Sequence, residues 1–200
     1  MKKIALAFLC YVMIIHPARA QESKGFSAFS IYTGVQNPIE IDVFGFGVDT
    51  RYQPGFKTGL AFSGEIKRLK VSLHVDYMNS KIETDDEEPG KNYLNYIQTK
   101  VLFWANVLAP GSKMKLNIGI GAGIMNYHHP SITRTLESGR VYSREASWDW
   151  APAIHSGLNF TYQFEEKLYL TVIQANDVIP DFASEFVFHQ SIVFGIQRAF

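Results

Sequence analysis

Histidine and aspartate side chains recur in the sequence at positions where acid–base or hydrolytic chemistry is conceivable. His74 stands two residues before Asp76, and His155 directly precedes Ser156. A hydrolase site needs a nucleophile, a base and an orienting acid within hydrogen-bond reach. Adjacent residues of a strand point to opposite faces, so His155 cannot activate Ser156. The sequence therefore predicts no catalytic residues and a protein that is not an enzyme.

Three other patterns resemble ligand sites but lack the spacing that such sites need. His128-His129 precedes Pro130 in an expected loop, which is not helical spacing for zinc. The acidic segment 83–88 lacks the alternating ligands and distal Glu of a calcium loop, so a solvated loop end is expected, with loose divalent-cation contact as the alternative. Gly119-x-Gly121-x-Gly123 has Ile124 where the dinucleotide fingerprint needs its third glycine. We expect no metal site and no cofactor.

The elements that hold these residues follow a two-residue period. Apolar and polar residues alternate from Leu69 to Tyr77 and again over 115–124 and 154–164. Weaker alternation occurs near 26–36, 54–65, 93–106, 167–176 and 186–200, and the connections alternate between short ones and long ones near 37–53, 79–92, 127–147 and 177–185. Eight antiparallel strands with tight turns at one end and long loops at the other indicate an all-β fold, an eight-stranded antiparallel up-and-down transmembrane β-barrel.

The polar faces of these strands are expected to line the inside of the barrel. Side chains largely fill a barrel of only eight strands, so the polar ones must satisfy one another there. The candidate polar network of the lumen consists of Lys57, Lys70, His74, Asp76, Lys100, Lys115 and His155. Its expected role is structural.

Aromatic residues gather near the ends of the expected strands, which is typical of girdles at two membrane interfaces. Those towards the loops are Tyr52, Phe56, Tyr77, Tyr93, Tyr96, Tyr127, Trp148 and Trp150, and those towards the turns are Phe62, Phe103, Trp104, Tyr162, Phe164 and Tyr169. The third long loop also carries arginines. The candidate external contacts, to phosphate-bearing lipid or an external partner, are Arg134, Arg140, Arg144, Trp148 and Trp150, with an interfacial girdle and ordinary loop charges as the alternative.

The first twenty residues read as a secretory signal. Lys2 and Lys3 precede an apolar stretch from Ile4 to Ile15, and Ala18-Arg19-Ala20 supplies small residues for cleavage. We expect residues 1–20 to be removed and 21–200 to form one outer-membrane barrel domain. Cleavage would remove Cys10, the only cysteine. A net charge of zero in the full chain argues against a nucleic-acid partner.

The C-terminus resembles the signal that outer-membrane barrels present to their assembly machinery. The chain ends on Phe200, and the candidate signal is Ile192, Phe194, Ile196 and Phe200, with Arg198 as a departure. Together with Pro54-Gly55-Phe56, Tyr93-Leu94-Asn95-Tyr96-Ile97 and Gly119-Ile120-Gly121-Ala122-Gly123, this region makes residues 26–200 resemble the PorT-like outer-membrane β-barrel family of Bacteroidota. The resemblance implies an eight-stranded barrel in the outer membrane and no common substrate.

We therefore expect a small integral outer-membrane protein with a structural or surface-binding role, in adhesion or membrane integrity, and no open pore. It would lie in the outer membrane of a Gram-negative bacterium with both termini periplasmic. Its partners would be outer-membrane lipids and lipopolysaccharide, the barrel assembly machinery and an unidentified extracellular ligand. The alternatives are a soluble exported lipocalin-like barrel that binds a small apolar ligand, and an outer-membrane lipid-modifying enzyme.

Overall fold

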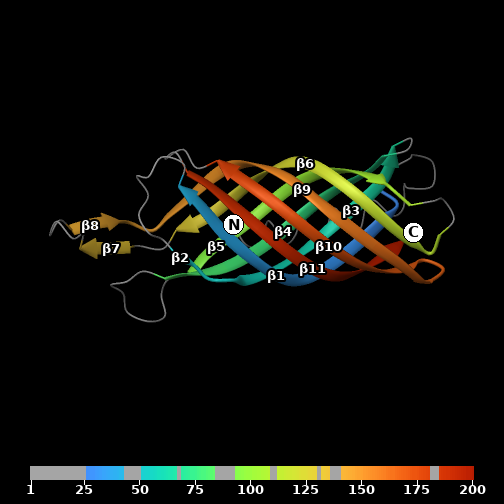
Figure 1. Ribbon diagram of the computed structural model, residues 1–200, viewed down its shortest axis with the longest axis horizontal. Coiled ribbons are helices and arrows are strands. Elements are labelled where there is room, and N and C mark those ends of the chain that lie inside the picture. Colours follow the sequence, from blue (N-terminus) through green and yellow to red (C-terminus); the bar gives the residue numbers. More distant parts are fainter. Residues whose placement is uncertain are drawn as a thin grey trace, which may run out of the picture.

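Long antiparallel strands make up most of the chain (Figure 1). The computed structural model describes residues 26–42, 51–66, 69–83, 93–108, 112–129, 132–135, 141–180 and 185–200. The signal expected over 1–20 lies outside these residues. The eight long strands are β1 (Ala28–Asp42), β3 (Gly55–Ile66), β4 (Leu69–Glu83), β5 (Tyr93–Asn106), β6 (Met114–His129), β9 (Ser147–Glu165), β10 (Leu168–Pro180) and β11 (Glu185–Ala199).

Each long strand pairs with the next one along the chain, and the last pairs with the first. β1 pairs with β11 from Ala28↔Ala199 to Asp42↔Glu185, which closes the sheet into a barrel. Closure leaves no free edge along the paired wall, so the backbone groups there bond one another. The prediction of a closed, eight-stranded antiparallel barrel is confirmed.

Three short strands decorate one end of the barrel. β2 (Arg51–Tyr52) pairs with the end of β4, and β7 (Ile132–Thr135) pairs with β8 (Val141–Arg144). Figure 1 shows the β7–β8 hairpin projecting beyond the barrel at the left, at the end of the long connections. The loops expected from residues 37, 79, 127 and 177 begin later, because β1, β4, β6 and β10 run on to residues 42, 83, 129 and 180.

The two faces of the wall differ in polarity. On β9, residues with odd numbers from Ala151 to Thr161 are buried inside, whereas the even-numbered ones face out. The outward side chains include Ile154, which is 60% exposed, and Leu158, which is 44% exposed. Within the described residues, no helix is long and apolar enough to cross a membrane. The polar faces therefore point inwards, which is the opposite of what a soluble barrel with an apolar cavity needs.

Two apolar layers cross the interior. One, towards the long connections, consists of Met78, Tyr96, Met125, Ala151, Ala153 and Ile179. The other, towards the short turns, consists of Tyr32, Ala61, Leu102, Trp104, Ile173, Ala175 and Val193. A glycine at 119 makes room for the second layer, because a Cβ there would lie 2.3 Å from Cε3 of Trp104.

The girdle prediction is wrong for Tyr127, Tyr96 and Trp104. Tyr127 on β6 packs against the apolar layer nearer the long connections. Tyr96 and Trp104 are inside the barrel, 3% and 1% exposed. They share the inward face of β5 with Gln98 and Lys100, because side chains of equal parity lie on one face of a strand. Phe103 and Phe164 do face outwards near the turns, and Tyr77 and Tyr93 do so near the loops.

Candidate functional site

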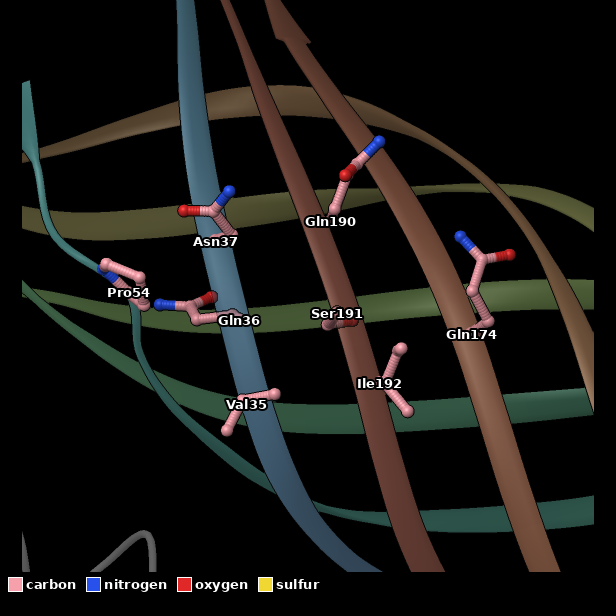
Figure 2. A pocket seen from close by; sticks show the side chains of 8 residues that line it. All are labelled: Val35, Gln36, Asn37, Pro54, Gln174, Gln190, Ser191 and Ile192. Atoms are coloured by element: carbon pink, nitrogen blue, oxygen red, sulfur yellow. The ribbon is translucent and has the colours of Figure 1, made fainter.

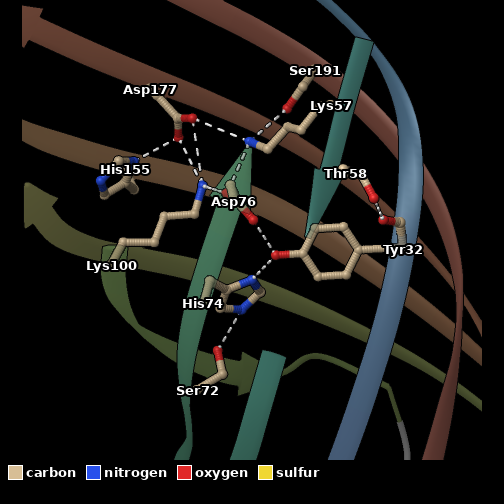
Figure 3. A network of polar contacts seen from close by, with 10 residues as sticks. All are labelled: Tyr32, Lys57, Thr58, Ser72, His74, Asp76, Lys100, His155, Asp177 and Ser191. Atoms are coloured by element: carbon tan, nitrogen blue, oxygen red, sulfur yellow. Dashed lines mark hydrogen bonds and ion pairs between the residues drawn. The ribbon is translucent and has the colours of Figure 1, made fainter. Parts of the chain in front are cut away.

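Four charged side chains meet between the two apolar layers, one from each of four strands (Figure 3). Lys57 of β3 lies 3.3 Å from Oδ2 of Asp76 and 3.3 Å from Oδ2 of Asp177. Lys100 of β5 lies 3.1 Å from Oδ2 of Asp76 and 3.3 Å from Oδ1 of Asp177. All four side chains are at most 2% exposed. Each lysine thus contacts both aspartates, and we call this set the charged centre.

Two further strands contribute to the charged centre. Nδ1 of His155 on β9 lies 2.6 Å from Oδ1 of Asp177, and Nζ of Lys57 donates to Oγ of Ser191 on β11 at 3.3 Å. Asp177 therefore accepts from two ammonium groups and one imidazole. A buried carboxylate is stable only with such partners, because taking an unpaired charge out of water is costly.

A chain of hydrogen bonds runs from the charged centre towards the short turns. The hydroxyl of Tyr32 donates to Oδ1 of Asp76 and lies 2.8 Å from Nδ1 of His74. Nε2 of His74 lies 2.8 Å from Oγ of Ser72, which accepts from Nε1 of Trp104 at 2.7 Å. Since Tyr32 gives its only proton to Asp76, Nδ1 of His74 must carry the proton of that contact, and Ser72 then donates to Nε2. Every proton in this chain has one acceptor, and all of them point towards Asp76.

Gly59 provides the space in which Tyr32 and Asp76 meet. A Cβ at this position would lie 2.3 Å from Oδ1 of Asp76 and 2.7 Å from Cε2 of Tyr32. No real side chain tolerates contacts that short, so the tyrosine and the carboxylate bond each other across a glycine.

The charged centre joins four strands of the barrel by ion pairs. Two positive lysines balance two negative aspartates, so the assembly is neutral when His155 is neutral. The ammonium groups occupy the space between the carboxylates where a metal cation would bind. Packed apolar layers lie on both sides of the charged centre.

Most of the predicted lumen residues come together, but not all. Lys57, His74, Asp76, Lys100 and His155 belong to the network. Lys70 lies nearer the turns, where its Nζ donates to Oε1 of Gln197 at 3.1 Å. Lys115 is exposed at the start of β6, because the barrel is open at that end. The predicted network omits Asp177, Tyr32 and Ser191. It also omits His189, which packs edge-on against Tyr96 with ring centroids 4.8 Å apart.

The other predicted sites lie on the outside of the wall. Trp148 and Trp150 are 61% and 62% exposed on the outward face of β9, and Trp148 packs against His128 with ring centroids 5.0 Å apart. Arg134 and Arg144 belong to the β7–β8 hairpin, and Arg140 lies outside the described residues. The proposed assembly-signal residues all face outwards at the end of the chain: Ile192, Phe194, Ile196 and Phe200.

Solved structures share this fold. Neisserial surface protein A (NspA) matches with a TM-score of 0.58 at 13% sequence identity, over 86% of this chain and 99% of that chain. The outer membrane protein OprG of Pseudomonas aeruginosa matches with a TM-score of 0.51 at 12% identity, over 89% of this chain and 98% of that chain. No family model and no curated protein matches the sequence. The chain therefore has the fold of small outer-membrane β-barrels, and its resemblance to the PorT-like family stays a prediction.

Proposed function

We propose that this chain is a small integral protein of the outer membrane of a Gram-negative bacterium, with a structural or surface-binding role and no open pore. One observation carries the proposal: a closed β-wall that is apolar outside and charged inside. Exposed outward residues such as Ile120 (64%), Val35 (62%) and Phe194 (60%) would be costly in water and are suited to lipid. All eight long strands exceed the roughly 9–11 residues needed to cross a bilayer.

The interior supports the absence of a pore. Ion pairs join β3, β4, β5 and β10 across the lumen, and an apolar layer covers each side of them. A narrow barrel of eight strands has little room beyond its own side chains. The charged centre thus links strands across the space in which a lipocalin would hold its apolar ligand.

The two ends of the barrel suggest its orientation. The backbone N–H of Phe200 donates to the carbonyl of Ser27, which places both ends of the described wall together at the short-turn end. Figure 1 shows the C-terminus at the end opposite the β7–β8 hairpin. Short turns face the periplasm in bacterial outer-membrane barrels, so both termini are assigned there and the hairpin to the cell surface.

The proposed partners follow from these surfaces. Lipids and lipopolysaccharide surround the outer wall, with Trp148 and Trp150 as contacts near the headgroups. The assembly machinery would recognise the outward residues at the end of β11. The hairpin, with Arg134 and Arg144, would bind an unidentified extracellular ligand. Membership of the PorT-like group is part of the same proposal.

The proposal keeps the chain outside the enzyme classes. His155 is inside the wall and Ser156 is outside it, so the one adjacent His–Ser pair spans the sheet. Ser72 and His74 do share the inward face, with Oγ of Ser72 2.8 Å from Nε2 of His74, but both side chains are buried and Ser72 also accepts from Trp104. A lipid-modifying enzyme would need its base and nucleophile on one side and open to the lipid. An unchanged lipid A profile in cells that produce His155→Asn or Ser156→Ala protein would support this assignment. A changed profile would instead support the lipid-modifying enzyme.

Membrane fractionation tests the location directly. The outer-membrane fraction is run on a denaturing gel with and without boiling, and we expect a band there whose mobility shifts on heating. A soluble band without a heat shift would refute the proposal. Replacing 132–144 by a short Gly-Ser linker then tests surface binding: cells should lose attachment to host or abiotic surfaces while the heat shift is retained.

A further inference from the structure

Carboxamide side chains interrupt the apolar outer wall on the neighbouring strands β1, β11 and β10. Asn37 on β1 and Gln190 on β11 both face outwards and are exposed. Each has apolar outward neighbours on its own strand: Val35 and Ile39 beside Asn37, and Phe188 and Ile192 beside Gln190. These carboxamides are therefore surrounded by the surface that the proposed function places in lipid.

Strand register gathers these side chains into one row. Asn37 pairs with Gln190, Gln190 with Asn176 on β10, and Asn176 with Ser156 on β9. Gln174 lies beside the row and donates to Oδ1 of Asn176 at 2.9 Å. Neighbouring strands are about 4.8 Å apart, so the row extends over roughly 15 Å of wall. We call Asn37, Gln190, Asn176, Gln174 and Ser156 the carboxamide row.

Ser156, at one end of the row, lies at the middle height of the wall, whereas Asn37 and Gln190 lie nearer the long connections. On β9 the outward positions run from Trp148 to Phe164, and Ser156 is midway between these two aromatic residues. On the opposite side of the barrel, the outward residues in the middle of β4 are Val71, Leu73, Val75 and Tyr77, with no carboxamide among them.

The row holds hydrogen-bonding capacity that the chain does not use. In the described part of the chain, the side chains of Asn37 and Gln190 make no hydrogen bond, and Asn176 uses only its acceptor. A pocket of about 260 Å³ opens beside them, lined among others by Gln174, Val35 and Ile192 (Figure 2). No water is present in the hydrocarbon to satisfy free amides, so a partner is needed.

We infer that the carboxamide row is a contact surface for a second copy of this chain within the membrane. A carboxamide both donates and accepts, so a row of carboxamides is complementary to itself when two copies meet about a two-fold axis. The row carries no charge, and two copies therefore approach without repulsion. The pocket receives an apolar side chain of the opposing wall. This inference goes beyond the proposed function and rests on its claim that the outer wall faces lipid.

Cysteine cross-linking tests the inference in native outer membranes. The only cysteine is Cys10, in the expected signal, so an introduced cysteine is unique in the mature chain. Gln190→Cys should give a disulfide-linked dimer. The matched control is Val101→Cys, which replaces an outward residue in the middle of β5, on the far side of the barrel. We expect about tenfold less dimer from the control, as follows from a contact stabilised by a few membrane-buried hydrogen bonds.

A second variant separates the contact from the fold. Asn37→Leu with Gln190→Leu should reduce the dimer fraction about tenfold in detergent or nanodiscs, measured by sedimentation or native mass spectrometry. The heat shift on a gel should be retained. It tests the membrane assignment independently of the dimer fraction. Equal cross-linking at positions 190 and 101, a monomer at every concentration, or cross-linking of position 190 to a different protein would each overturn the inference.

Discussion

The charged centre and the carboxamide row are separated by only one sheet, yet their polar groups are satisfied in different ways. Asp177 faces in and Asn176 faces out, and the same holds for Ser191 and Gln190 on the next strand. Inside, full charges are tolerated because lysines and aspartates of the same chain neutralise each other. Outside, only neutral groups occur in the row, and their unused hydrogen bonds call for another molecule.

The largest expected effect comes from breaking the charged centre. Asp177→Ala leaves Lys57, Lys100 and His155 with one carboxylate between them, and we expect a loss of about 3–5 kcal/mol in the free energy of unfolding. Urea unfolding from lipid vesicles measures it. Ser156→Ala, on the outside of the paired strand, is the control and should change stability by less than about 0.5 kcal/mol. Equal effects of the two changes would refute the structural role of Asp177.

Removing a balanced pair should cost less than removing one charge. In Lys57→Met/Asp177→Leu, Lys100 and Asp76 remain as one ion pair. The double variant should therefore lose about 1–3 kcal/mol less unfolding free energy than the two single variants lose together. The same unfolding measurement on both singles and the double completes the cycle. Additive losses would mean that the four charges do not act together.

A hydrogen bond of the buried chain should contribute more to the free energy of unfolding than a similar bond on the outside of the wall. Tyr32→Phe removes the donor to Asp76 and the acceptor for His74, and we expect a loss of about 1–3 kcal/mol because both partners stay buried. Tyr77→Phe is the matched control: its exposed hydroxyl donates to Asn95 at 2.7 Å. That change should cost about 0.5 kcal/mol. A control loss as large as that of Tyr32→Phe would contradict the comparison.

The smallest expected effect on the single barrel lies in the row. Gln190→Leu puts an apolar side chain where a carboxamide faces lipid, so the unfolding free energy of the monomer should stay the same or rise by up to about 1 kcal/mol. Refolding into vesicles at low protein-to-lipid ratio measures the monomer alone. A clear loss of stability would mean that Gln190 serves its own barrel.

The alternation of apolar and polar residues is enough to predict the strands of the wall, because in a strand with one face in lipid the apolar residues recur at every second position. His74 and Asp76 were found because Leu73, Val75 and Tyr77 alternate with them without a break. Burial within the lumen was not predictable near the ends of strands: Lys115 shares the inward face of β6 but lies where the barrel opens. Pairwise contacts such as Lys57 with Asp177 depend on register across several strands, which the sequence does not state.

Asp177 was missed for a reason that involves the carboxamide row. In Gln174-Ala175-Asn176-Asp177, both faces of β10 carry polar residues, and the run resembles the start of a loop. The structure shows that the strand continues to Pro180, with Ile179 inside and Val178 outside. Because polar residues occur on both faces of this stretch, the alternation of polar and apolar residues that marks a strand is lost there. Neither the outward amides nor the inward carboxylate of Asp177 could therefore be recognised from it.

The ion pairs of the lumen also distinguish the native register of the strands from shifted ones. Lys57 and Asp177 are 120 residues apart, so their contact forms only after most of the strands have been placed. A slip of one residue between neighbouring strands would turn Asp177 or Lys57 into the lipid, and a slip of two would move the partners one step apart along the strand. A barrel closed in the wrong register would therefore carry unpaired buried charges and be less stable than the native one.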